Sequence, residues 1–333
     1  HQIVLPGFYA ADGKAAESSA KSGRIWQVRF RPDREGRWDY SVSFRKGIGI
    51  AISDDPQAGT PLPPDGTHGS IQVLPVSVGT WGRLIVSGSR YLQDQETQDY
   101  FLKGGPNSPE NFLAFTDFDG TRRAIPEEDR DGEAAVDQLH SYDLHIRDWN
   151  AGDPSWQGGK GKGIIGALNY IASKGMNVVY FLTMNIGGDG KDVWPYISPE
   201  ERLRFDCSKL DQWEIVFDHM DNLGLMQHMV LQETENEKLL DEGDTGPERK
   251  LYLRELIARF AHHRRVTWNM GEENGPANFS PNGQNTRQQK DMIAYVKKND
   301  PYRNLTVVHS HANPHHRDSL FNLLLGFPEL DGI

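Results

Sequence analysis

The segment Trp268 to Asn274, WNMGEEN, places two adjacent glutamates at the end of an apolar run. A glutamate held at a strand's end and half desolvated by aromatic neighbours can have its pKa raised and then transfer a proton near neutral pH. Hydrolysis of a glycosidic bond needs such an acid, and a second carboxyl group that serves as nucleophile or base. Glu273 fits the role of the acid. Glu272 is the alternative, but adjacent strand residues point in opposite directions, so only one of the two should face a shared site.

Polar residues also follow the other predicted strands. In a (β/α) barrel the working residues lie just after the carboxyl ends of the strands, so these side chains are expected to share one mouth. The expected ligand-binding residues of this kind are Asn185, Glu233, Glu235, Asn269, Asn274, His309 and His311. Two solvated loop glutamates are the alternative interpretation of Glu272 and Glu273, whereas Glu233 and Glu235 directly terminate an apolar strand.

Tryptophans near the same strand ends favour a sugar ligand, because the apolar face of a pyranose ring stacks on an aromatic ring. We expect Trp149, Trp194 and Trp268 to act as such platforms, and Asp148 to bind a hydroxyl group. The alternative is that these tryptophans are core residues, since large aromatic side chains dominate buried area.

The histidine-rich segment HSHANPHH suggests a different chemistry. Its histidines His309, His311, His315 and His316 are candidate metal ligands, and two histidines two residues apart on a strand point to the same side. The chain contains no HExxH motif, so we expect no metal in the active site and no cofactor. A calcium ion at NIGGDGKD stays open, although the twelve-residue spacing of a calcium loop is absent. The segment DFDGT at 117–121 matches a phosphatase nucleophile loop but lacks a strong strand before it.

Composition narrows the class of partner. The 333 residues include 36 basic and 47 acidic ones, and the formal net charge of -11 would repel phosphate backbones and anionic lipids. No apolar run approaches the roughly 18 to 20 residues of a membrane-spanning helix. Nucleic acid and membrane are therefore not expected as partners. Cys207 is the single cysteine, which excludes an intrachain disulfide.

The pattern of elements predicts two domains. Between residues 23 and 75, short runs of alternating apolar and polar residues are separated by Gly, Pro and Asp, which is typical of antiparallel strands. Residues 1–76 are therefore assigned to a small β-sandwich, incomplete at its N-terminal side. From residue 77 to 333, helices alternate with apolar strands, beginning with GIIGALNYIASKG and MNVVYFLTMN.

This alternation predicts an α/β fold with a parallel sheet. No GxGxxG turn opens any helix, which favours a (β/α)8 TIM-type barrel over a nucleotide-binding sheet. We count about five strand–helix units and the start of a sixth, whereas a closed barrel has eight strands. The barrel is therefore expected to stop after about strand six and to be incomplete at its C-terminal side.

The order WNMGEEN resembles the fourth-strand motif of clan A glycoside hydrolases, in which the last Glu is the acid/base. Glu273 matches that position, and Glu272 stands where the clan usually has Asn. Longer segments, among them FLKGGPNSPENF, FLTMNIGGDGKDVWPY and DPYRNLTVVH, resemble secreted bacterial glycoside hydrolases that carry an N-terminal sandwich domain of unknown function.

The resemblance implies an enzyme that cleaves O-glycosidic bonds in a polysaccharide or oligosaccharide with retention of configuration. It also implies a secreted or periplasmic location, with a leader that is not part of this chain, and a nucleophile on a seventh strand beyond residue 333. The alternative is a non-catalytic carbohydrate-binding or scaffold protein with a degenerate barrel. The sequence predicts no oligomeric state.

Overall fold

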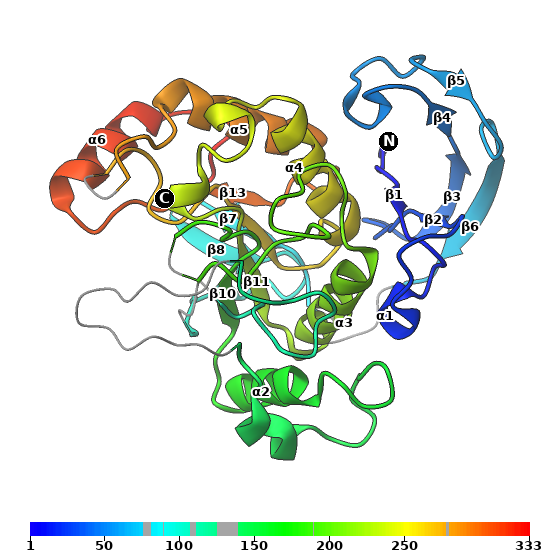
Figure 1. The fold of residues 1–333 in the computed structure, drawn as a ribbon, viewed down its shortest axis with the longest axis horizontal. Helices are drawn as coiled ribbons and strands as arrows, with labels where there is room; N and C mark the ends of the chain where they lie inside the picture. The colour runs from blue at the N-terminus through cyan, green and yellow to red at the C-terminus, as the bar shows by residue number, and fades with distance from the viewer. Residues whose placement is uncertain (76–80, 89, 107–110, 125–138, 189, 278–279) are drawn as a thin grey trace.

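The computed structural model describes residues 1–75, 81–88, 90–106, 111–124, 139–188, 190–277 and 280–333. The N-terminal part consists of small antiparallel sheets that lie to one side of the rest of the molecule (Figure 1). Strand β1 (Phe8–Tyr9) pairs with β2 (Trp26–Gln27), β3 (Gly36–Ser41) with β6 (His68–Val73), and β4 (Arg45–Lys46) with β5 (Thr60–Pro61). The short α1 (Ala15–Ser18) and η1 (Ile50–Ile52) lie between them in the chain. Antiparallel structure was expected here and is confirmed, while the expected domain boundary at 76 lies outside the described residues.

A three-stranded antiparallel sheet follows, formed by β7 (Leu84–Ser87), β8 (Tyr91–Asp94) and β9 (Tyr100–Phe101). Its β8 is fixed to the remainder of the chain by a buried ion pair, in which Arg265 Nη2 lies 2.6 Å from Asp94 Oδ2. The chain then reaches the parallel sheet at Gly104, whose carbonyl oxygen accepts a hydrogen bond from Asn177 N. The segment around Gly104, rather than β9 itself, therefore lies beside the parallel sheet.

The parallel sheet is the centre of the molecule. Its strands are β10 (Val178–Leu182), β11 (Met226–Val230), β12 (Val266–Asn269) and β13 (Leu305–Val307), hydrogen-bonded in that order and all parallel. The connections contain α2 (Lys162–Ser173) before β10, then α3 (Cys207–Leu223), α4 (Pro247–Phe260), α5 (Thr286–Asn299) and α6 (Pro314–Leu324). Three short 3-10 helices, η2 (Asp143–Asp148), η3 (Thr234–Asn236) and η4 (Asp241–Gly243), lie in the loops. A parallel bridge between Val307 and Gly332 continues the sheet past β13. The predicted alternation of helices and parallel strands is confirmed.

Local sequence explains where the helices begin and end. The Asp206 side chain accepts a hydrogen bond from Lys209 N at the start of α3, and Gly224 ends that helix with a positive φ of 70°. Asn285 and Gln288 form a reciprocal capping box at the start of α5. These caps satisfy backbone groups that the first and last turns leave without partners.

The two faces of the parallel sheet differ. Alternate residues of a strand point to opposite faces, so Val179 and Phe181 join the main hydrophobic core with α3, α4 and α5. Val178 belongs to a separate cluster on the other face, together with Met226, Leu305 and Leu84. This second face carries the cavity described below. Among the residues that the structure describes, no helix is both long and apolar enough to cross a membrane.

Lys209 in α3 predicts a pH dependence of stability. Its side chain is fully buried above the Trp194 ring, and burial lowers its pKa from 10.5 to about 8. The unfolded chain therefore binds more protons than the folded one between these values, so stability rises with pH across this window. Relative to a Lys209→Met variant, the parent should gain about 2–3 kcal/mol of unfolding free energy between about pH 7 and about pH 10. Urea denaturation of both proteins across this range measures the difference, and a difference independent of pH would contradict the assignment.

Candidate active site

An open cavity of about 480 Å³ lies on the face of the parallel sheet opposite the main core. Side chains of all four strands and of the segments beside them line it. The lining residues are Lys103, Gly104, Gly105, Pro106, Val178, Tyr180, His228, Asn269, Val307, Val308, His309, Ser310, Phe321 and Ile333. Among the residues that the structure describes, the lining contains no aspartate or glutamate, although the chain as a whole is strongly acidic.

Polar contacts connect the side chains on the cavity floor. Lys103 Nζ lies 2.9 Å from His228 Nδ1, and Asn269 Nδ2 lies 3.1 Å from His228 Nε2. Tyr180 OH lies 2.9 Å from His309 Nδ1. Burial, followed by the charge of Lys103, lowers the pKa of both His228 and His309, and that of His228 falls well below its usual value. Neutral imidazoles, a phenol and an amide therefore line this floor beside the ammonium group of Lys103, and together they donate and accept hydrogen bonds.

The candidate acid lies on the loop that leaves β12. The loop is fixed on both sides, because Glu272 N donates to Gln232 O (2.9 Å) and Asn274 N donates to His309 O (2.7 Å). The Thr234 hydroxyl lies within 2.7 Å of the Glu272 carbonyl oxygen and 3.0 Å of that of Glu273. Glu273 is thus carried by a loop that is tied to the ends of both neighbouring strands.

Glu273 itself has an unusual backbone conformation. Its φ is +48°, in the left-handed region that residues with a side chain rarely adopt. Such a conformation costs of order 1 kcal/mol or more and persists only where surrounding contacts enforce it, which is common at functional sites. The side chain is half-buried, and no described residue forms a hydrogen bond with its carboxylate. Glu273 is not among the cavity-lining residues, but Asn269, four residues earlier at the end of β12, is.

Glu237 is a buried carboxylate that the sequence analysis did not single out. It accepts hydrogen bonds from Asn274 Nδ2 (2.9 Å), Gly275 N (3.0 Å) and Gln284 N (2.5 Å). Burial raises its pKa in spite of these donors. Glu237 therefore joins the loop after β11 to the loop after β12, immediately beyond the candidate acid.

The expected ligand-binding residues separate into groups. Asn269 and His309 lie at the cavity, and Asn274 is buried against the His309 backbone. Glu233 is buried beside Gly188, whose positive φ and lack of a side chain are required because a β-carbon there would lie 2.3 Å from the Glu233 carboxyl group. Glu235 is exposed.

Other expected residues lie apart from the cavity. Trp268 and Trp194 are each 1% exposed in the main core, so neither presents a ring face to a ligand. The Trp268 indole donates to Asp300 Oδ2 (2.8 Å). Asn185 is also fully buried and holds its own loop by accepting from Val193 N (2.6 Å).

Three further residues were expected to bind the ligand. Asp148 lies beside α2, where His145 Nδ1 is 2.9 Å from its carboxylate. The neighbouring Trp149 is half-buried, and its ring is covered by the ammonium group of Lys162. His311 is half-buried on the loop that precedes α6, where its Nδ1 accepts from Asn313 N (3.0 Å).

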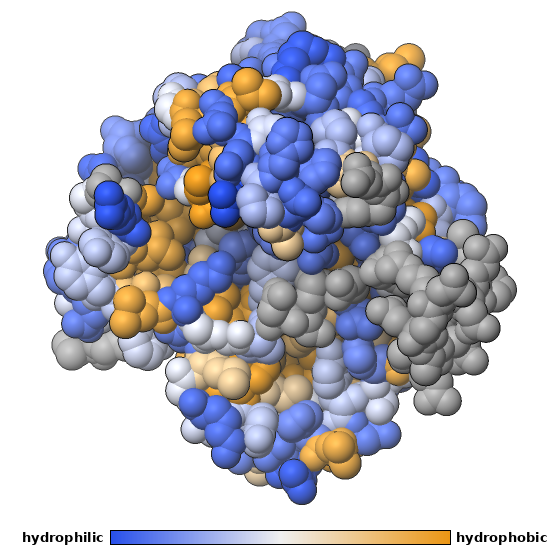
Figure 2. Space-filling view, turned by 90° about the vertical axis from the view of Figure 1, so that its left-hand side faces the viewer, coloured by the Kyte–Doolittle hydropathy of each residue, from blue (hydrophilic) through white to orange (hydrophobic). Residues whose placement is uncertain are grey.

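On the side of the molecule that carries α6, apolar residues form several separate patches among hydrophilic ones (Figure 2).

Comparisons with known proteins support the overall fold. Residues 1–45 match a family described as a domain of unknown function (DUF5060). A solved structure described as a "putative glycoside hydrolase" from Bacteroides vulgatus matches 94% of this chain with a TM-score of 0.58 and 16% sequence identity. This chain covers 50% of that protein, so it spans about half of its length.

A glycoside hydrolase family 5 structure from the same organism matches 69% of this chain and 39% of its own, with 15% identity and a TM-score of 0.39. That score is too low to carry an argument. A comparison with curated proteins found no match. The chain therefore has a fold like that of the first structure, and its N-terminal part resembles DUF5060.

Proposed function

We propose that this protein hydrolyses O-glycosidic bonds in an oligosaccharide or polysaccharide, with Glu273 as the general acid/base. The observation that carries the proposal is the placement of Glu273. It lies directly after the carboxyl end of β12, on a loop held by both neighbouring strands, with a backbone conformation that only its surroundings enforce. In (β/α) barrel enzymes this end of the strands carries the catalytic residues.

The proposal includes a (β/α) barrel as the fold of the catalytic part. Supporting it, β10 to β13 are neighbours in chain order without a reversal, whereas a doubly wound sheet reverses its order at a switch point. The segment around Gly104 on one side and Gly332 on the other extend the same order. The likeness to the Bacteroides vulgatus structure described as a "putative glycoside hydrolase" is a further support for the proposed activity.

The chemistry of the cavity floor is compatible with a sugar ligand. His228, His309, Tyr180 and Asn269 present neutral hydrogen-bonding groups of the kind that bind hydroxyl groups. A second carboxyl group is needed for hydrolysis, and we assign no residue to it. Retention of configuration belongs to the proposal on the clan A resemblance alone. Export from the cell belongs to it on the resemblance to secreted bacterial glycoside hydrolases alone.

Release of reducing ends from a panel of polysaccharides tests the proposal on the native protein at its full length. The anomer that forms first, followed by NMR during hydrolysis, is expected to have the configuration of the substrate. The opposite anomer would exclude retention, because an inverting enzyme uses water on the opposite face of the sugar ring. Binding to a polysaccharide without any release of reducing ends would instead favour the non-catalytic alternative.

A further inference from the structure

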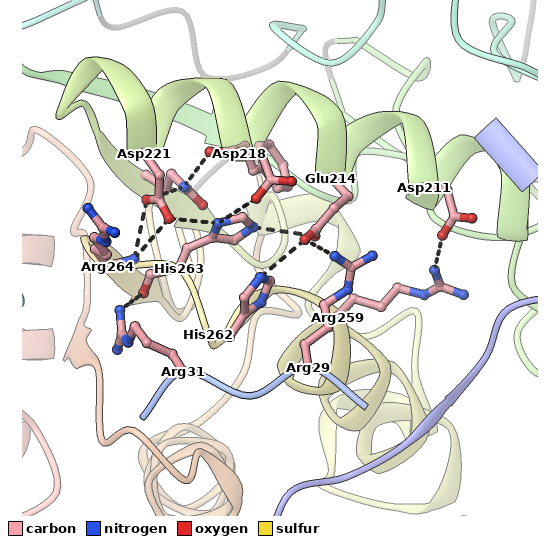
Figure 3. Close-up of polar contacts among 12 residues, drawn as sticks. Arg29, Arg31, Asp211, Glu214, Asp218, Asp221, Arg259, His262, His263 and Arg264 are labelled. Carbon is pink, nitrogen blue, oxygen red and sulfur yellow. Dashed lines mark hydrogen bonds and ion pairs between the residues drawn. The ribbon is translucent and has the colours of Figure 1, made fainter. Parts of the chain in front are cut away.

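A cluster of histidine and carboxylate side chains lies where α3 meets the turn between α4 and β12 (Figure 3). Glu214 and Asp218 are four residues apart on α3 and therefore share one face of that helix. His262 and His263 belong to the turn after α4. One ligand atom from each of these four side chains lies within 4.8 Å of those of the other three, and no second such group was found among the described residues.

We propose that Glu214, Asp218, His262 and His263 form a binding site for a divalent transition-metal ion, with zinc as the best match. Two imidazole nitrogens and two carboxylate oxygens make a ligand set that zinc accepts in tetrahedral sites. With metal–ligand bonds of about 2.0–2.1 Å, neighbouring ligand atoms of a tetrahedron lie about 3.3 Å apart. The two Glu214 oxygens each face one imidazole at about this distance, since His262 Nε2 lies 3.2 Å from Oε1 and His263 Nε2 lies 3.3 Å from Oε2.

The surroundings of His263 match those of a metal ligand. The ring is fully buried, and its Nδ1 lies 3.1 Å from Asp221 Oδ2 while its Nε2 faces Glu214. Asp221 is itself held by the backbone N–H of Arg264 and by Gln227 Nε2. A histidine that binds a metal through one nitrogen usually donates its other N–H to a carboxylate in this way, which fixes the ring.

His262 supplies the second nitrogen. Its Nε2 faces Glu214, and its Nδ1 is buried without a hydrogen-bond partner in the part of the chain that the structure describes. Among the described residues, the only polar contact of this ring is therefore the one that its Nε2 makes within the cluster. Asp218 completes the set from an exposed position, which leaves a route from solvent to the site.

The N-terminal segment supplies a competing cation. Arg29 forms an ion pair with Glu214, and Arg31 donates a hydrogen bond to the carbonyl oxygen of His263 (Figure 3). A bound metal ion would share Glu214 with Arg29 and experience its positive charge. An Arg29→Gln variant is therefore expected to bind zinc at least about fivefold more tightly than the parent.

With four protein ligands the site has the character of a structural one, in which the ion fastens α3 to the turn that leads into β12. Ligands that bind only the folded state raise its stability by mass action. Zinc is therefore expected to raise Tm by several degrees, and a chelator to reverse the increase.

The test is a titration of chelator-treated, desalted protein with zinc chloride, followed by calorimetry and thermal denaturation. We expect one ion per chain, and visible absorption typical of tetrahedral coordination when cobalt replaces zinc. His262→Ala and Asp218→Asn should each weaken binding at least about tenfold. The Asp218→Asn variant keeps the test decisive if His262→Ala does not fold, because the Asp218 side chain is 60% exposed.

His315→Ala is the matched control, since His311, His315 and His316 form a separate histidine group at the start of α6, with ring centroids 5.4 and 5.9 Å apart. Binding should be unchanged in this variant. Absence of zinc binding up to millimolar concentration would show that the cluster is an ion-pair network alone. Binding that is lost in His315→Ala but retained in His262→Ala would also overturn the proposal.

Discussion

A Glu273→Gln variant is expected to fold like the parent and to lose about 10²- to 10⁴-fold in kcat on a glycan substrate. The amide keeps the size of the side chain but cannot deliver a proton to the leaving oxygen. On an activated aryl glycoside the leaving group needs no proton. The variant should therefore lose much less of the rate at which the bond to the leaving group is cleaved. Comparison of kcat on the two substrates therefore separates loss of the acid from loss of the fold, which thermal denaturation checks independently.

Glu272→Gln is the matched control for this experiment. It removes the same charge from the neighbouring residue on the same loop, yet it is expected to leave kcat within a few-fold of the parent. Equal losses of kcat in both variants would show that catalysis depends on the negative charge of the loop and not on a single proton donor. Full activity of Glu273→Gln would remove Glu273 from the mechanism.

Strand alternation explains which site residues the sequence could and could not predict. The apolar runs and helical periodicities were sufficient to predict a parallel sheet alternating with helices, because each signal is local. Trp268 and Asn269 were both expected at the site, but adjacent residues of a strand must face opposite sides. The structure places Asn269 at the cavity and Trp268 in the core. Nothing in the sequence determines which of the two faces inward when both faces of a strand are buried.

The same limit explains the residues that were missed. Tyr180 and His228 lie within strands that are buried on both faces, so their runs show no polar–apolar alternation that would mark the cavity side. Glu237 belongs to a charged segment that is typical of a solvated surface, and its three donors come from residues 274–284. The metal-binding candidates Glu214 and His263 are likewise about fifty residues apart. Contacts of this range follow from the tertiary fold rather than from local pattern.

An Arg249→Met variant is expected to lower the free energy of unfolding by about 3–5 kcal/mol. Arg249 is fully buried in α4. Its guanidinium donates to Gln232 Oε1, to the carbonyl oxygens of Glu237 and Leu240, and to that of Asp244. Methionine fills a similar volume without a donor, so four acceptors of the loop after β11 would lose their partner. Urea denaturation measures the change.

The position of these acceptors links the stability of this loop to the site. The loop from Gln232 to Asp244 carries Thr234, which contacts the carbonyl of Glu273, and Glu237, which holds the loop beyond it. In the Arg249→Met variant, amide hydrogen exchange should therefore accelerate in this loop and in residues 271–275. The kcat of the same variant should fall. Arg287→Met is the control, because Arg287 also contacts Asp244, through the carboxylate and from an exposed position, and exposed ion pairs contribute little. If Arg249→Met and Arg287→Met were equally stable, the buried guanidinium would not be what orders the loop. The strained conformation of Glu273 would then have to be enforced from the β13 side, through the contact of Asn274 with His309.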